Sequence, residues 1–93
     1  MNEVLIPNSN GTIYINSNQY SNVNNSSVIQ LMNINLSVGT AVDIHETNSG
    51  ASTRIGRITL AAGETVYLRK NPANGIRAYN GAVYATGCAV QEG

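Results

Sequence analysis

The segment 58–70 constrains the fold of this chain most strongly, because polar and apolar residues alternate on both sides of a short break. Ile58 and Leu60 alternate with polar neighbours before the Ala-Ala-Gly-Glu break. Val66 and Leu68 do the same after it. Alternation with a period of two is typical of half-buried strands, and a glycine-containing break between two such runs is typical of a hairpin. The segment therefore predicts strand, tight turn and strand, with these four residues in a core.

The rest of the chain repeats this pattern at a spacing of roughly ten residues, with turn signals between the runs and no helical periodicity. We expect an all-β fold of about eight short antiparallel strands in a two-sheet sandwich, for which a jelly roll is one arrangement. Ninety-three residues make one domain, 1–93. Residues 1–8 are expected to form an extended arm or an edge strand, because Pro7 cannot donate to a ladder. The expected strands are 3–7, 12–16, 28–38, 41–46, 54–60, 64–70, 76–79 and 82–90.

The longest strand candidate, 28–38, sets expectations about which residues face the core. Met32, Leu36 and Val38 share its inward phase with Ile34, whereas Ile29 and Leu31 point outward. Outward apolar residues need a cover, either a partner or the Asn- and Ser-rich loop at 17–27. In that loop, Tyr20 and Val23 are the residues that would anchor it to the body or to a neighbour.

Asp43 and His45 share one face of the strand at 41–46, with Glu46 beside them. A metal site or an acid–base pair is one interpretation, but solvated polar residues on an outer face are the interpretation we prefer. Catalysis also needs a nucleophile, an orienting group and an oxyanion site, and no such set is recognisable. Ile55 and Ile58, three residues apart around Gly56, predict a bulge.

The core is thin, because Ile, Val and Leu make up 22 of 93 residues and the chain has no Phe or Trp. Cys88 is the only cysteine, so no internal disulfide forms, and with one histidine a structural zinc site is implausible. Cys88 is expected to be a small buried residue rather than a nucleophile. Oligomerisation or docking on a larger surface is the remaining support for so small a core.

The net charge is zero, but the charges are segregated. Residues 1–53 carry a charge of −3 and residues 54–93 a charge of +3. Overall neutrality argues against direct nucleic-acid binding, which depends on phosphate neutralisation. Segregated charge favours two copies, or a copy and a partner, meeting in register, although an ordinary solvated surface is also consistent with it. No apolar run approaches the ~20 residues that span a bilayer, and the first residues are unlike a secretory signal, so no membrane association is expected.

Two segments carry a resemblance to a known class of proteins. They are Ile-Thr-Leu-Ala-Ala-Gly-Glu-Thr-Val-Tyr-Leu-Arg-Lys-Asn-Pro at 58–72 and Ala-Val-Tyr-Ala-Thr-Gly-Cys-Ala-Val at 82–90. Together they make residues 54–91 resemble small virion structural proteins of tailed phages, notably those that infect cyanobacteria. The resemblance implies a capsid decoration, or cement, protein that binds the major capsid protein or another virion protein, commonly as a homo-oligomer and in particular a trimer. It implies no catalytic residue and no cofactor.

The expected function is therefore that of a non-enzymatic virion protein on the capsid exterior, assembled in the host cytoplasm and stabilising the shell. Two alternatives remain open, namely a neck, tail or fibre component of the virion and a small carbohydrate-binding module that uses Tyr14, Tyr20 or Tyr67. The basic residues of the second half would suit acidic groups on a partner. The residues expected to bind a partner are Val4, Leu5, Ile6, Tyr20, Ile29, Leu31, Arg57, Tyr67 and Arg69.

Overall fold

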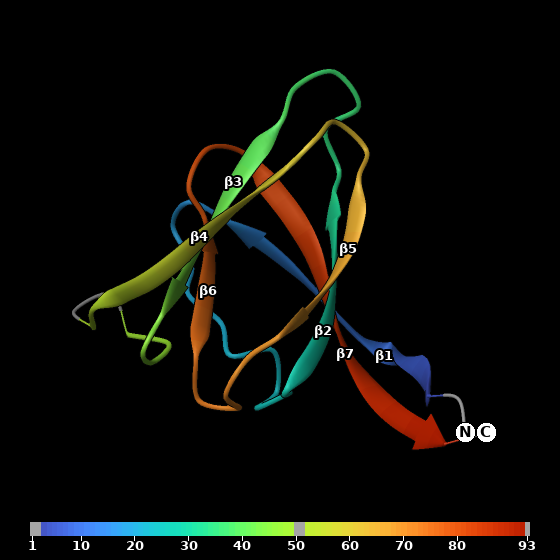
Figure 1. The fold of residues 1–93 in the computed structure, drawn as a ribbon. Coiled ribbons are helices and arrows are strands. Elements are labelled where there is room, and N and C mark those ends of the chain that lie inside the picture. The colour runs from blue at the N-terminus through green and yellow to red at the C-terminus, as the bar shows by residue number, and fades with distance from the viewer. Residues whose placement is uncertain (1–2, 50–51, 93) are drawn as a thin grey trace.

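The computed structural model describes residues 3–49 and 52–92, with side chains described for 11–49 and 52–88. These residues form seven strands and no helix (Figure 1). The strands are β1 (Glu3–Asn16), β2 (Val28–Asn33), β3 (Thr40–His45), β4 (Arg54–Leu60), β5 (Thr65–Arg69), β6 (Gly75–Ala78) and β7 (Ala82–Glu92). All pairings are antiparallel.

The strands form two sheets, one of four strands in the order β1-β7-β2-β5 and one of three in the order β4-β3-β6. The expected all-β sandwich is therefore confirmed. A hydrophobic core lies between the sheets and takes residues from both of them. Its buried members are Ile15, Val23, Ile29, Leu31, Val42, Ile44, Leu60, Ile76, Val83 and Ala85.

The chain passes between the two sheets after β2, β4, β5 and β6, so β3 and β4 are the only consecutive strands that pair. An isolated antiparallel bridge joins Ser21 to Ile76 of β6, at the free edge of the three-stranded sheet. If Ser21 is counted as a vestigial strand, the order of strands is that of a jelly roll, with two Greek keys wrapped on each other. The loop at 17–27 therefore occupies the place of a missing eighth strand.

The predicted hairpin at 58–70 is wrong in its pairing. β4 belongs to the three-stranded sheet and β5 to the four-stranded one, so the turn between them links the two sheets. The backbone N–H of Ala61 donates to the Glu64 carboxylate at 2.8 Å, and Gly63 adopts a positive φ of 70°. The expected core placement is confirmed, because Leu60 is buried and Ile58, Val66 and Leu68 pack against the core. The alternation of polar and apolar residues correctly identified the two strands. The same alternation also flanks a turn that joins strands of two different sheets, so it did not reveal which strands pair.

The strand predicted at 28–38 is shorter than expected and has the opposite phase. β2 ends at Asn33, whose buried amide donates to the carbonyls of Val38 and Ala61 at 2.9 and 3.1 Å. Its Oδ1 accepts from the Thr40 hydroxyl at 3.1 Å. This polar side chain organises the turn that follows, and residues 34–39 leave the sheet. The sequence pattern predicted that Asn33 would face outward, but its side chain is buried.

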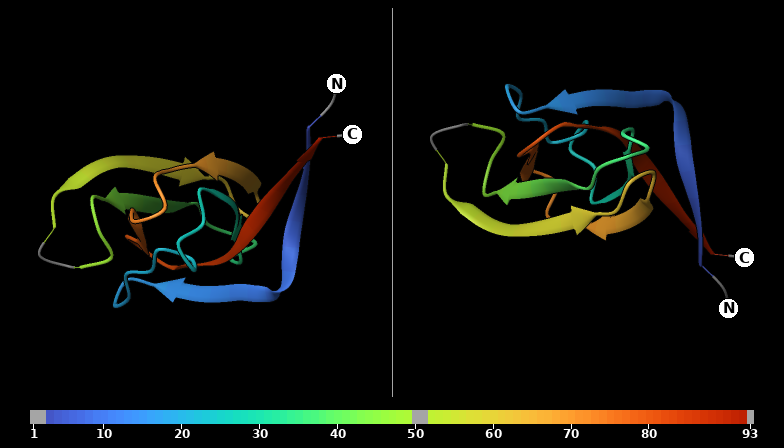
Figure 2. Two further views of the ribbon diagram at one scale, coloured as in Figure 1. Left: turned by 90° about the horizontal axis from the view of Figure 1, so that it is seen from below. Right: turned by 90° about the horizontal axis from the view of Figure 1, so that it is seen from above.

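The first strand and the last form a long ribbon. The two strands expected at 3–7 and 12–16 are one strand, β1, with a shift in register between Pro7 and Thr12. β7 pairs with β2 only over 83–87, so residues 88–92 pair with β1 alone. We call the paired segments 3–7 and 88–92 the terminal ribbon. Figure 2 shows it extending from the body of the sandwich with both chain ends at its tip. β1 is an edge strand throughout.

Candidate binding surfaces

An exposed row of aromatic and apolar side chains crosses the outer face of the four-stranded sheet. Tyr14, Tyr84 and Met32 are register partners on β1, β7 and β2, and are 47%, 40% and 38% exposed. The rings of Tyr14 and Tyr84 meet edge to face, 6.0 Å apart. We call Tyr14, Tyr84, Met32 and Tyr67 the tyrosine face.

Tyr67 extends the tyrosine face on β5, two residue pairs along the ladder from Met32. It pairs in register with Gln30, and the Gln30 amide donates to the Tyr67 hydroxyl at 3.2 Å. On the other side of Gln30, Thr86 shares a hydrogen bond of 2.9 Å with Thr12. The side chains along this face come from four hydrogen-bonded strands and contact one another, so the face is assembled within a single copy of the chain.

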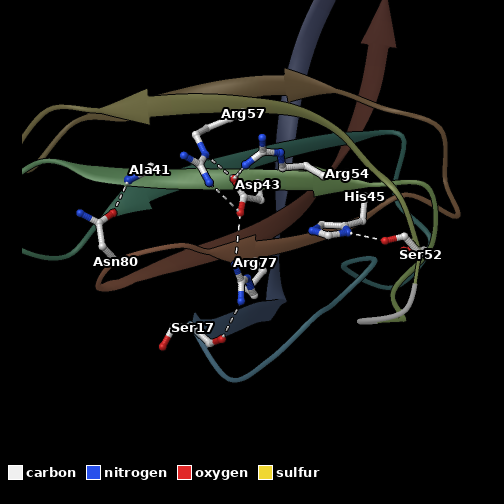
Figure 3. Close-up of polar contacts among 9 residues, drawn as sticks. All are labelled: Ser17, Ala41, Asp43, His45, Ser52, Arg54, Arg57, Arg77 and Asn80. Carbon is white, nitrogen blue, oxygen red and sulfur yellow. Dashed lines mark hydrogen bonds and ion pairs between the residues drawn. The ribbon is translucent and has the colours of Figure 1, made fainter.

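A second cluster lies on the three-stranded sheet, where Asp43 of the central strand β3 is surrounded by arginines (Figure 3). Arg57 of β4 donates to both carboxylate oxygens, at 2.5 and 3.3 Å. Arg77 of β6 donates at 3.3 Å, and Arg54 lies 3.8 Å away. We call Asp43, Arg54, Arg57 and Arg77 the arginine cluster. It ties the three strands of the sheet together through one carboxylate.

Aromatic rings surround the arginine cluster. The Arg57 guanidinium lies 4.1 Å from the Tyr79 ring centroid, and the Arg77 guanidinium lies 5.4 Å from that of Tyr20. Such stacking holds guanidinium groups in place and leaves donors free at their edges. The hydrogen bond from Arg57 lowers the pKa of Asp43 against the raising effect of burial. Asp43 is therefore held as an anion by its neighbours.

The expected exposure of the polar residues on β3 is wrong. Asp43 is 1% exposed and His45 is 7% exposed, and only Glu46 is open to solvent. The reason is the cover that the arginines and Tyr20 provide. The Tyr20 ring meets His45 edge to face at 4.8 Å, and His45 Nδ1 lies 3.1 Å from the carbonyl oxygen of Ser52.

Two further side chains could in principle take part in a reaction, the amine of Lys70 and the thiol of Cys88, but their surroundings disfavour it. Lys70 donates from Nζ to the carbonyls of Asn22, Asn71 and Pro72, at 2.9, 3.3 and 3.1 Å, and burial lowers its pKa to about 8. Burial raises the pKa of the half-buried Cys88 thiol, which disfavours the reactive thiolate. Within residues 3–49 and 52–92, the His, Cys, Asp and Glu side chains form no group of three that could hold a metal ion.

The residues expected to bind a partner are distributed over different surfaces. Val4, Leu5 and Ile6 lie in the terminal ribbon, opposite Gln91, Val90 and Ala89, and their side chains lie outside the described part. Ile29 and Leu31 are wrong as partner-binding residues, because both are completely buried in the core. Tyr20 does anchor its loop, as expected, through its contact with His45.

The expected partner-binding residues Arg57, Tyr67 and Arg69 are divided between the two sheets. Arg57 belongs to the arginine cluster of the three-stranded sheet, whereas Tyr67 and Arg69 lie on β5 of the other sheet. Arg57 and Arg69 therefore lie on different sheets, because β4 and β5 do not pair. Sequence reasoning missed Tyr84 and Met32 as surface residues, and the alternation around Tyr84 in 82–86 was the signal that could have revealed the first of them.

Comparison with known proteins gives no match: no family model, no curated protein and no solved structure is similar to this chain. The described part of the chain contains no helix of the length and apolarity that a membrane crossing requires. The surfaces themselves therefore carry the functional argument.

Proposed function

We propose that this chain is a non-enzymatic structural protein of a tailed-phage virion, in which it decorates the capsid exterior and stabilises the shell by binding the major capsid protein. The observation that carries the proposal is the tyrosine face, a preformed and exposed surface on a sandwich with a thin core. Aromatic side chains and methionine are enriched where proteins bind one another, because they bury apolar area at a small entropic cost.

Three further features support the proposal. The resemblance of residues 54–91 to phage virion proteins points to this class. The described side chains that could perform chemistry are held in structural contacts, as Asp43 and Lys70 are. The terminal ribbon offers an edge strand, β1, to which a neighbouring chain could add.

Binding to purified capsids tests the proposal. The full chain is mixed with expanded, undecorated capsids of the phage that encodes it, and the bound fraction is measured by co-sedimentation. We expect saturable binding that Tyr14→Ser with Tyr84→Ser weakens by about tenfold or more, as for central interface residues. Ile55→Ser removes an apolar side chain that is 54% exposed on the other sheet, and it is the matched control. Absence of binding to such capsids contradicts the proposal.

A carbohydrate-binding module is a second candidate, because three exposed tyrosines lie on one face of the four-stranded sheet. Sugar rings stack on aromatic rings, and Tyr14, Tyr84 and Tyr67 are 47%, 40% and 51% exposed. A glycan array probed with the wild-type chain and with Tyr67→Ala separates the candidates. Binding to glycans that Tyr67→Ala abolishes favours the module. Capsid binding without glycan binding favours decoration, and particle imaging separates decoration from a place in the neck, tail or fibre.

A further inference from the structure

We infer that copies of this chain associate head to tail, with the tip of the terminal ribbon of one copy docking on the arginine cluster of the next. The inference goes beyond the proposed function and does not rest on it, because both surfaces belong to this chain. Its first step is the charge of the arginine cluster. Three guanidinium groups share the single carboxylate of Asp43, which leaves an excess of two positive charges.

That excess charge is accessible to a partner. The side chains of Arg54, Arg57 and Arg77 are 52%, 36% and 25% exposed, whereas that of Asp43 is 2% exposed. A guanidinium presents five donors, and Asp43 offers too few acceptors for three such groups. The planar fork of arginine fits carboxylates in particular. The cluster therefore presents free, oriented donors that suit the carboxylates of a partner.

The terminal ribbon places two acidic residues together. Glu3 and Glu92 are register partners on the last described rung of the ribbon, followed by Val4 opposite Gln91 and Leu5 opposite Val90. Like charges directly opposite each other on a ladder are unfavourable. Cations from another molecule would relieve that repulsion.

The remaining acidic residues do not offer the same complement. Glu64 accepts a hydrogen bond from the backbone of Ala61, and Glu46 directly follows β3, the strand that carries Asp43 of the arginine cluster. Glu3 and Glu92 are thus the acidic pair that the topology brings together away from that cluster.

The two complementary surfaces face a second copy rather than each other. Both views of Figure 2 show the chain ends on the opposite side of the molecule from the beginning of β4, whose first residue is Arg54. The molecule measures 37 × 30 × 22 Å along its principal axes. A contact between two different surfaces of the same chain is heterologous, so it builds either a closed ring or an open chain.

Charge-changing substitutions on each surface test the inference by sedimentation velocity of the full chain. Glu3→Lys with Glu92→Lys changes the ribbon tip. Arg54→Glu changes the cluster at its most exposed member, which lies 3.8 Å from Asp43, so the closer pairs of Asp43 remain. We expect the wild-type chain to self-associate, and each variant to weaken association by about tenfold. Raising the salt from about 0.05 to 0.5 M should weaken wild-type association as well.

Sedimentation velocity of a mixture of the two variants is the decisive experiment. The unchanged tip of the Arg54→Glu variant meets the unchanged cluster of the ribbon variant, so the mixture should form complexes that neither variant forms alone. Circular dichroism and thermal melting check that each variant is folded. A monomeric wild-type chain at low salt overturns the inference, and so does a mixture of folded variants that stays monomeric. An Arg54→Glu variant that loses capsid binding without any change in self-association assigns the cluster to another partner and also overturns it.

Discussion

Asp43 has the most consequential surroundings of any residue in the described part of the chain, because one nearly inaccessible carboxylate joins side chains from all three strands of its sheet. Sequence position alone does not reveal this role. Alternation correctly places Asp43 on the face opposite Val42 and Ile44, but the cover over that face comes from Arg57, Arg77 and the loop at 17–27. Such cover depends on strand order, which a single sequence leaves open.

Asp43→Asn should therefore be costly at neutral pH. The change leaves three guanidinium groups without their carboxylate, and we expect the free energy of unfolding to fall by about 3 kcal/mol, at the lower end for a broken buried pair because the arginines are partly exposed. Urea denaturation followed by circular dichroism measures this loss. A loss under about 0.5 kcal/mol would mean that the cluster contributes little to stability.

The same carboxylate sets a dependence of stability on pH. The lowered pKa means that the unfolded chain binds more protons than the folded chain below the ordinary value of 3.8, so stability present above that pH is lost as the pH falls through the folded pKa. Denaturation at several pH values between about 2 and 6 should show a slope that Asp43→Asn reduces. Glu46→Gln, at an exposed position after the same strand, is the control and should keep the slope.

Gly75 tests close packing at a second position. A Cβ on Gly75 would lie 2.5 Å from the carbonyl oxygen of Thr47 and 2.5 Å from the Cα of Asn48, both of them backbone atoms. We expect Gly75→Ala to lower the free energy of unfolding by about 1–3 kcal/mol, as overpacking does. In Gly56→Ala, the nearest atom to the new Cβ is Ile44 Cδ1 at 3.9 Å, so this control should be close to neutral. Equal melting temperatures for the two variants would contradict the packing seen at β6.

At the scale of elements, the sequence identified strands better than their partners. The runs around β3, β5 and β7 alternate cleanly, and the bulge expected near Gly56 is confirmed by the register shift opposite Ile44 and His45. The pairing of β4 with β5 and the phase of β2 were wrong for different reasons. A short turn satisfies the same pattern whether it joins neighbours in a sheet or strands of two sheets. Asn33 is buried because its side-chain amide donates hydrogen bonds to the carbonyls of Val38 and Ala61. A hydropathy pattern gives no information about such hydrogen bonds.

Two neighbouring substitutions on β2 test its phase directly. Leu31 is 0% exposed and Met32 is 38% exposed. Leu31→Ala should lower the free energy of unfolding by about 2–5 kcal/mol through cavity formation, whereas Met32→Ala should change it by less than about 1 kcal/mol. Chemical denaturation of both variants gives the comparison. A larger loss of stability in Met32→Ala than in Leu31→Ala would mean that Met32 faces the core, as the sequence pattern predicted.

At the scale of the whole molecule, the sequence predicted one small sandwich with a thin core and segregated charge. The structure adds where those charges lie, with the arginine cluster on the three-stranded sheet and Glu3 and Glu92 at the ribbon tip. It also adds the tyrosine face on the opposite sheet. Two sides of the domain thus carry surfaces of different character, and the two proposals assign a different partner to each of them.

Imaging of intact particles tests the central claim most directly. Under the proposed function, electron cryomicroscopy of phage particles should show the sandwich in an icosahedral array on the outside of the capsid, with the tyrosine face against the major capsid protein. Mass spectrometry of the same particles should find the chain in many copies. A particle that lacks the chain, or that carries it only at the neck or tail, contradicts the account.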